Sequence, residues 1–210
     1  MLYGVVQSIL LYGALVWYGA LKIERYKAKM TSVQRKALIR VTSAYRTASA
    51  ATLQVISGIP PINLLAEESA YTYASSCGTR KGVREAPRER TMKRWQKEWE
   101  DHGRAQWTKV LIPEVELWAE TKHKKTDYYF TQFLTGHGAF KKYTEMIGKT
   151  EDGRCEECGR RDIPNHVVFE CPRYENERNT MEKEVGEEIT SRFVDIYLFG
   201  ENRCLDVTWN

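Results

Sequence analysis

The first 21 residues are apolar almost throughout, with no charged side chain and only Gln7 and Ser8 as clearly polar ones. A run of this length is long enough for a helix that crosses a membrane. Three glycines, three tyrosines and the lack of a basic flank before the run favour a different interpretation, a helix buried on most sides in a larger protein. We therefore expect no stable membrane association, and we interpret the chain as part of a longer one.

Between residues 22 and 45, apolar and basic side chains recur at helical spacing on two different faces. The apolar stripe consists of Met30, Val33, Ala37, Val41 and Ala44. The basic stripe consists of Arg25, Lys29, Lys36 and Arg40 and lies about 90° or more from the apolar one. The pattern predicts an amphipathic helix whose basic face is either solvated or placed against nucleic-acid phosphates.

Prolines and glycines mark the ends of the next helices. The Gly58-Ile59-Pro60-Pro61 stretch ends a helical segment at 51–56, because the first proline blocks continuation of the helix. A new helix is expected to begin near Pro61 and to hold helical spacing as far as Tyr73.

A cation-rich loop is expected at 78–82, followed by a charged helix or linker at 84–100. Trp95 and Trp99 are four residues apart and so share a face, which favours a packing anchor over a base-stacking platform. Pro113 is expected in the first turn of a further helix.

The end of the chain has the pattern of an acidic amphipathic helix. Its apolar face comprises Tyr174, Met181, Val185, Ile189, Phe193 and Ile196, and its other faces carry Glu182, Glu184, Glu187 and Glu188. Short strands are expected only at 167–169 and 197–199. The sequence therefore predicts a mainly α fold.

Composition and charge narrow the class of protein. With 42% apolar and 29% charged residues and a mean hydropathy of -0.55, disorder, collagen and a multi-span membrane protein are disfavoured. The net charge of +4 is unevenly distributed, since the first 60 residues carry 8 bases and 1 acid, whereas residues 179–210 carry 3 bases and 7 acids. A basic amino-terminal part suggests a polyanionic partner.

Three of the five cysteines form a motif with one histidine, Cys155-x2-Cys158-x7-His166-x4-Cys171, while Cys77 and Cys204 stand alone. An odd cysteine count without an export signal favours reduced, intracellular metal thiolates over disulfides. Three thiolates and an imidazole complete a tetrahedral Zn²⁺ site and leave no open position, so the predicted zinc is structural. The alternative is a coincidence of buried cysteines.

Arginines surround this motif. Arg154, Arg160 and Arg161 either offset the charge of the zinc thiolates or contact phosphates. Gly159 provides the backbone freedom for a tight turn around the metal. Seven residues separate Cys158 from His166, whereas the compact retroviral knuckle has four, so the RNA-gripping geometry of that knuckle does not transfer.

The sequence contains no recognisable catalytic group. It has no nucleophile with a base, no phosphate-binding glycine loop and no Asp-Asp dipeptide, which disfavours a self-sufficient metal-dependent polymerase. His137, between two glycines, is interpreted as a hydrogen-bonded turn residue in preference to a ligand or base.

Several strings together resemble the carboxy-terminal region of the reverse transcriptase polyprotein of jockey-like non-LTR retrotransposons. They are LLYGALVWYGAL at 10–21, VQRKALIRVTSAYRTASAATLQVISGIPPINLLAEE at 33–68, FLTGHGAFKKY at 133–143 and CEECGRRDIPNHVVFECPRYENER at 155–178. The resemblance implies a thumb region for the first two strings and a Cys-Cys-His-Cys finger for the last. The parent family is an RNA-directed DNA polymerase, a nucleotidyltransferase commonly joined to an endonuclease. No polymerase or nuclease signature has a matching position here, so no catalytic residue is carried over.

The resemblance implies a fragment that binds template RNA or primer DNA, supports target-primed reverse transcription and acts in the nucleus at the site of integration. Its other partner is the remainder of the polyprotein. The expected nucleic-acid contacts are Arg25, Lys29, Arg35, Lys36, Arg40, Arg46, Arg160 and Arg161. Two alternatives stay open: a domesticated or decayed zinc-containing module that binds another protein, and a single-span membrane protein anchored by the first 21 residues.

These inferences predict four successive regions. A basic, thumb-like helical region occupies 1–82 and a helical linker region occupies 83–150. A small zinc-binding module follows at 151–178, and an acidic amphipathic tail helix occupies 179–210.

Overall fold

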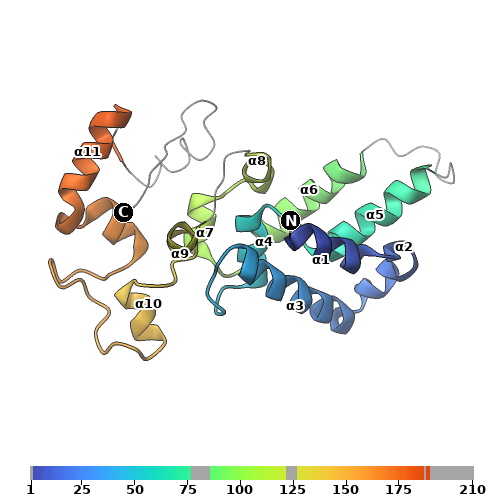
Figure 1. The fold of residues 1–210 in the computed structure, drawn as a ribbon, viewed down its shortest axis with the longest axis horizontal. Helices are drawn as coiled ribbons and strands as arrows, with labels where there is room; N and C mark the ends of the chain where they lie inside the picture. The colour runs from blue at the N-terminus through green and yellow to red at the C-terminus, as the bar shows by residue number, and fades with distance from the viewer. Residues whose placement is uncertain (1, 77–85, 122–126, 187, 190–210) are drawn as a thin grey trace. The chain divides into compact units, whose positions relative to one another are not determined.

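The computed structural model describes residues 2–76, 86–121, 127–186 and 188–189, and helices dominate it (Figure 1). Within these ranges no strand forms, and the only β pairing recorded is an isolated bridge between Arg154 and Arg161. The predicted mainly α fold is confirmed. The chain divides into two units, Met1–Ala105 with Glu114–Glu120, and Gln106–Pro113 with Thr121–Asn210.

The first unit is a set of packed helices. They are α1 (Leu2–Leu11), α2 (Ala14–Trp17), the 3-10 helix η1 (Tyr18–Lys22), α3 (Glu24–Val41), α4 (Ala50–Ser57), α5 (Ile62–Ser76), α6 (Pro87–Glu100) and α8 (Val115–Glu120). The second unit contains α7 (Gln106–Leu111), α9 (Tyr128–Thr135), α10 (Lys141–Met146), the π-helical turn η2 (His166–Glu170), the 3-10 turn η3 (Pro172–Tyr174) and α11 (Glu175–Val185).

The apolar amino-terminal run is divided into short helices. Gly13 adopts a left-handed conformation, with φ at 64°, between α1 and α2. Taken singly, no described helix is long and apolar enough to cross a membrane, although Tyr3–Leu11 and Ala14–Lys22, bent by 53°, satisfy those criteria as a pair. Ala14 and Leu21 are buried in a cluster with Ala66 of α5. Within this chain, therefore, the run is covered on one side only.

Helix α3 forms where the pattern predicted it, but the predicted apolar stripe is wrong in part. Val33 and Val41 are 45% and 38% exposed, whereas Gln34 and Leu38 are fully buried. The buried line of the helix therefore passes through a polar residue, which an apolar periodicity passes over.

Gln34 is buried without loss because its side chain is fully hydrogen-bonded. Its Nε2 donates to the Tyr3 hydroxyl at 3.1 Å and to the Pro60 carbonyl at 2.9 Å. Its Oε1 accepts from Gln54 Nε2 at 2.8 Å and from the Ile62 amide at 3.1 Å. One amide thus joins α1, α3, α4 and the start of α5.

The helix boundaries around the two prolines follow local rules. Ser49 caps α4, because its Oγ accepts from the Thr52 amide at 3.1 Å, and Gly58 ends the helix in a left-handed conformation with φ at 67°. Helix α5 begins at Ile62, directly after Pro61, as the sequence predicted.

The aromatic residues of α6 anchor the first unit. Trp95 and Trp99 are each 2% exposed, which confirms the predicted packing role. Trp118 of α8 is also buried, and its Nε1 donates to the Ile56 carbonyl at 3.0 Å. Helix α8 begins at Val115, so Pro113 precedes the helix instead of lying in its first turn.

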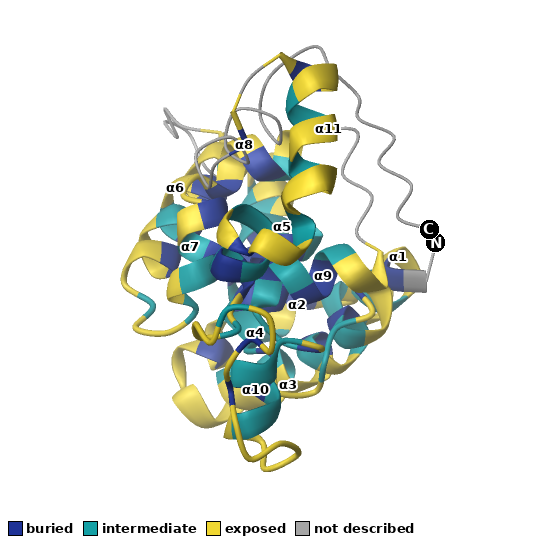
Figure 2. Cartoon of the chain, turned by 90° about the vertical axis from the view of Figure 1, so that its left-hand side faces the viewer, coloured by how far each residue is buried: buried dark blue, intermediate teal, exposed yellow. Residues whose placement is uncertain are grey.

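Helix α11 begins as predicted but ends at Val185, where Gly186 is left-handed with φ at 82°. Val185 and Ile189 form a small cluster with Phe169 and Met181, and much of the rest of α11 is exposed (Figure 2). Several predicted features lie outside the described residues: the loop at 78–82, Glu187, Phe193, Ile196, the strand at 197–199 and the remainder of the tail helix.

Candidate metal centre

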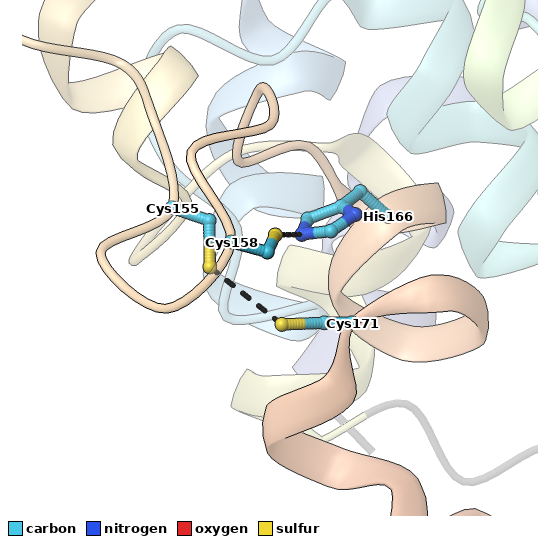
Figure 3. Close-up of side chains that lie close together, drawn as sticks. All are labelled: Cys155, Cys158, His166 and Cys171. Carbon is cyan, nitrogen blue, oxygen red and sulfur yellow. Dashed lines mark hydrogen bonds between the residues drawn. The ribbon is translucent and has the colours of Figure 1, made fainter.

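The four motif residues converge on one point in the second unit (Figure 3). One ligand atom from each of Cys155, Cys158, His166 and Cys171 lies within 4.8 Å of all the others. The Cys155 and Cys171 Sγ atoms are 3.6 Å apart, and Cys158 Sγ is 3.2 Å from His166 Nε2. Because Cys158 is half-buried and the other three are buried, the centre is largely closed to water.

A tight backbone turn presents the first two cysteines. The Gly159 amide donates to the Cys155 carbonyl at 2.9 Å, and the Cys155 amide donates to the Arg160 carbonyl at 2.7 Å. Gly159 has φ at 70°, a conformation that side chains disfavour. The turn thus brings both thiols to one side, as its glycine predicted.

A π-helical turn presents the other two ligands, where the sequence predicted a short strand at 167–169. The Cys171 amide donates to the His166 carbonyl at 2.7 Å, five residues back. Such a turn holds more residues than an α-helical one, so positions five apart return to the same face. The four-residue spacing of the motif therefore fits a π turn, and the predicted strand is wrong.

The loop that carries the centre is fastened to α10. Asp162 accepts from the Lys141 amide through Oδ1 at 3.2 Å and from the Lys142 amide through its carbonyl at 3.1 Å. Lys141 Nζ also lies 2.5 Å from Glu156. These contacts tie the metal-binding loop to the first turn of a neighbouring helix.

The donor set and the spacing fit zinc. Zn–S bonds of about 2.3 Å in a tetrahedron place sulfur atoms about 3.8 Å apart, close to the 3.6 Å between Cys155 and Cys171. A disulfide needs about 2.05 Å, and the three cysteines are free thiols. The hydrogen bond from His166 is the largest of the effects that lower the pKa of Cys155 to about 6, which favours the thiolate that binds metal. Burial raises the pKa of Cys171.

The expected nucleic-acid residues are distributed over both units. Arg25, Lys29, Lys36 and Arg40 are exposed on α3, and Arg46 is exposed in the loop that follows. Arg35 is partly buried and donates from Nε to the Ala48 carbonyl at 3.0 Å and from Nη2 to the Arg46 carbonyl. Its guanidinium therefore supports the loop after α3.

Arg160 and Arg161 belong to the metal-binding loop of the second unit. Both side chains are exposed, and Arg160 Nη1 lies 3.4 Å from Glu170 Oε2. Arg161 lies close enough to Glu145 to contribute to the lowered pKa of that carboxyl, although the hydrogen bond from Lys142 is the largest cause.

His137 lies in the turn after α9. Its ring stacks on Tyr143 with centroids 4.6 Å apart, and burial lowers the pKa of its imidazole. The next residue, Gly138, has φ at 111°, and a Cβ there would lie 1.7 Å from Gln132 Oε1. The turn is thus built around a buried glutamine side chain.

Sequence reasoning missed three polar residues on which these arrangements depend: Gln34, Asp162 and Glu170. A polar residue within a predicted apolar line was the available signal for Gln34. For Glu170 the signal was an acid four residues after the histidine ligand, since histidine ligands commonly pair with a carboxylate.

The helical fold and the closed Cys-Cys-His-Cys cluster define an α-helical chain with a candidate structural metal centre. No known family and no solved structure matches the chain. It is 25% identical over 201 residues to the 115 kDa protein of the type-1 retrotransposable element R1DM of Drosophila melanogaster. The match covers 84% of this chain but only 19% of that protein. The similarity supports the expected relation to a retrotransposon protein.

Proposed function

We propose that the chain is a nucleic-acid-binding part of a non-LTR retrotransposon polyprotein, in which a reverse transcriptase copies element RNA at its target. It corresponds to the thumb and the carboxy-terminal finger and supports the reaction without a catalytic centre of its own. The similarity to a retrotransposable-element protein supports this origin.

The exposed basic face of α3 is the observation that carries the proposal. Its four cations, Arg25, Lys29, Lys36 and Arg40, recur along one helix while the opposite line through Gln34 and Leu38 is buried. A helix held rigidly in this way presents charges at fixed spacing to a phosphate backbone. Such contacts give affinity with little sequence preference, so template RNA and primer DNA are both suitable ligands.

Replacing Lys29, Lys36 and Arg40 by glutamine is expected to weaken binding to a single-stranded RNA oligonucleotide. If all three contact phosphates, the slope of log affinity against log salt becomes shallower by about 2. Fluorescence anisotropy over a salt series measures this slope. A matched control replaces the exposed cations Lys93, Lys97 and Arg104, away from α3, with the same change in charge. Equal losses in the two triple variants, or none in the first, would contradict the assignment.

The other partner in the proposal is the remainder of the polyprotein, which covers the exposed apolar face of α1 and α2. Val5, Ile9, Tyr12 and Val16 are 61%, 70%, 86% and 88% exposed. A helix that is apolar all round is stable in water only when further protein covers it. The matched relative is long enough to supply this cover, since the match takes up only 19% of it.

Hydrogen exchange tests this second contact. Amides of α1 and α2 are expected to be better protected in a chain extended by its upstream reading frame than in the 210-residue chain. Ile9→Lys with Val16→Lys is expected to remove that added protection. Unchanged protection in the extended chain would contradict the contact, and partition of the chain into a detergent phase would favour a membrane anchor.

A further inference from the structure

The second ring nitrogen of His166 faces away from the other ligands of the metal centre. Nε2 is directed at Cys158 Sγ, at 3.2 Å, while Nδ1 is buried and has no hydrogen-bond partner within normal distance. The carboxylate atom Glu170 Oε2 lies 3.9 Å from Nδ1, four residues along the same π-helical turn. A buried N–H without an acceptor is costly, so this carboxylate is its natural partner.

Two neighbouring side chains hold the Glu170 carboxylate in place. Asn165 Nδ2 donates to Oε1 at 2.5 Å, and Arg160 Nη1 lies 3.4 Å from Oε2. The carboxylate is therefore fixed from both sides at the edge of the metal centre, although it is itself partly exposed.

The chemistry of a histidine ligand gives this arrangement a purpose. An imidazole that binds a metal through Nε2 must carry its proton on Nδ1, and a carboxylate that accepts this proton fixes the tautomer and the ring orientation and makes the ligand more basic. We propose that Glu170 is a positioning residue for the metal centre, which holds His166 with Nε2 toward the cysteines, and that Arg160 and Asn165 hold Glu170. This inference rests on the metal centre described above.

The proposal also assigns a structural role to an arginine expected to contact nucleic acid. Arg160 serves the centre through Glu170, whereas Arg161 is not part of this chain of contacts. Of the two arginines, Arg161 is the one whose replacement leaves the centre unchanged.

Zinc affinity, measured by competition with a chelator, tests the proposal. Glu170→Leu is expected to weaken zinc binding by about 10- to 100-fold. Glu170→Gln keeps an acceptor for the Nδ1 proton and is expected to lose less. Glu157→Leu is the matched control, since it removes an exposed glutamate from the same loop and is expected to leave the affinity unchanged.

A spectroscopic readout separates positioning from general support of the fold. In the zinc-loaded chain, the proton NMR signal of the His166 Nδ1–H is expected downfield, as in a hydrogen bond to carboxylate, and to move upfield in Glu170→Leu at saturating zinc. Wild-type affinity in Glu170→Leu, or an unmoved signal, would overturn the proposal. Failure of the wild-type chain to bind zinc at all would instead overturn the metal centre.

Discussion

Replacing Cys155 by serine or His166 by alanine is expected to abolish zinc binding and to unfold the metal-binding loop with α11. In this region the described apolar cluster joins only Phe169, Met181, Val185 and Ile189, too little to hold a fold alone. A structural zinc contributes about 10 to 16 kcal/mol to small zinc-binding peptides, far more than this cluster supplies. The helices of the first unit do not depend on it and are expected to stay folded.

Metal analysis and amide hydrogen exchange check this result. The wild-type chain should bind one zinc ion, and a chelator should remove protection at 153–185 while α3 to α6 keep theirs. Cys77→Ser is the control, because this cysteine stands outside the motif and its replacement should leave the zinc in place. Full zinc content in Cys155→Ser and in His166→Ala would contradict a metal centre at these residues.

Gln34→Leu is expected to lower the free energy of unfolding by about 3 kcal/mol or more, even though the two side chains are similar in size. The substitution leaves the Tyr3 hydroxyl, the Gln54 amide, the Pro60 carbonyl and the Ile62 amide without the partner that joins them. Each buried polar group left unsatisfied costs about 1 to 3 kcal/mol. Burial already raises the pKa of Tyr3, as expected for a hydroxyl held away from water.

Urea denaturation followed by circular dichroism measures this loss. The control is Gln106→Leu, at an exposed position of α7, where a change within about 0.5 kcal/mol is expected. An unchanged midpoint for Gln34→Leu would show that the hydrogen-bonded glutamine is not what joins α1, α3 and α4.

Local patterns predicted much of the fold. Helix α3, the proline-marked boundary between α4 and α5, and the burial of Trp95 and Trp99 follow from residues a few positions apart. The four metal ligands were predictable for the same reason, since a cysteine and histidine motif records its own geometry. Their meeting within 4.8 Å agrees with that spacing.

The remaining features depend on contacts that spacing does not record. The four partners of Gln34 lie 20 to 31 residues away from it, so apolar periodicity placed Val33 and Val41 on the buried face instead. The turn at 167–169 was mistaken for a strand because adjacent Val and Phe residues suit both conformations. The division of the apolar run at Gly13 depends on a left-handed backbone conformation that glycine permits but does not require.

The salt dependence of RNA binding by the intact chain tests the central claim most directly. With four phosphate contacts on α3, the affinity for a single-stranded RNA oligonucleotide should fall with a log–log slope of about -3 between 50 and 200 mM salt. That result would support a zinc-stabilised, nucleic-acid-binding part of a retrotransposon polyprotein. Absence of RNA affinity at low ionic strength, together with salt-insensitive capture of a protein partner, would contradict it.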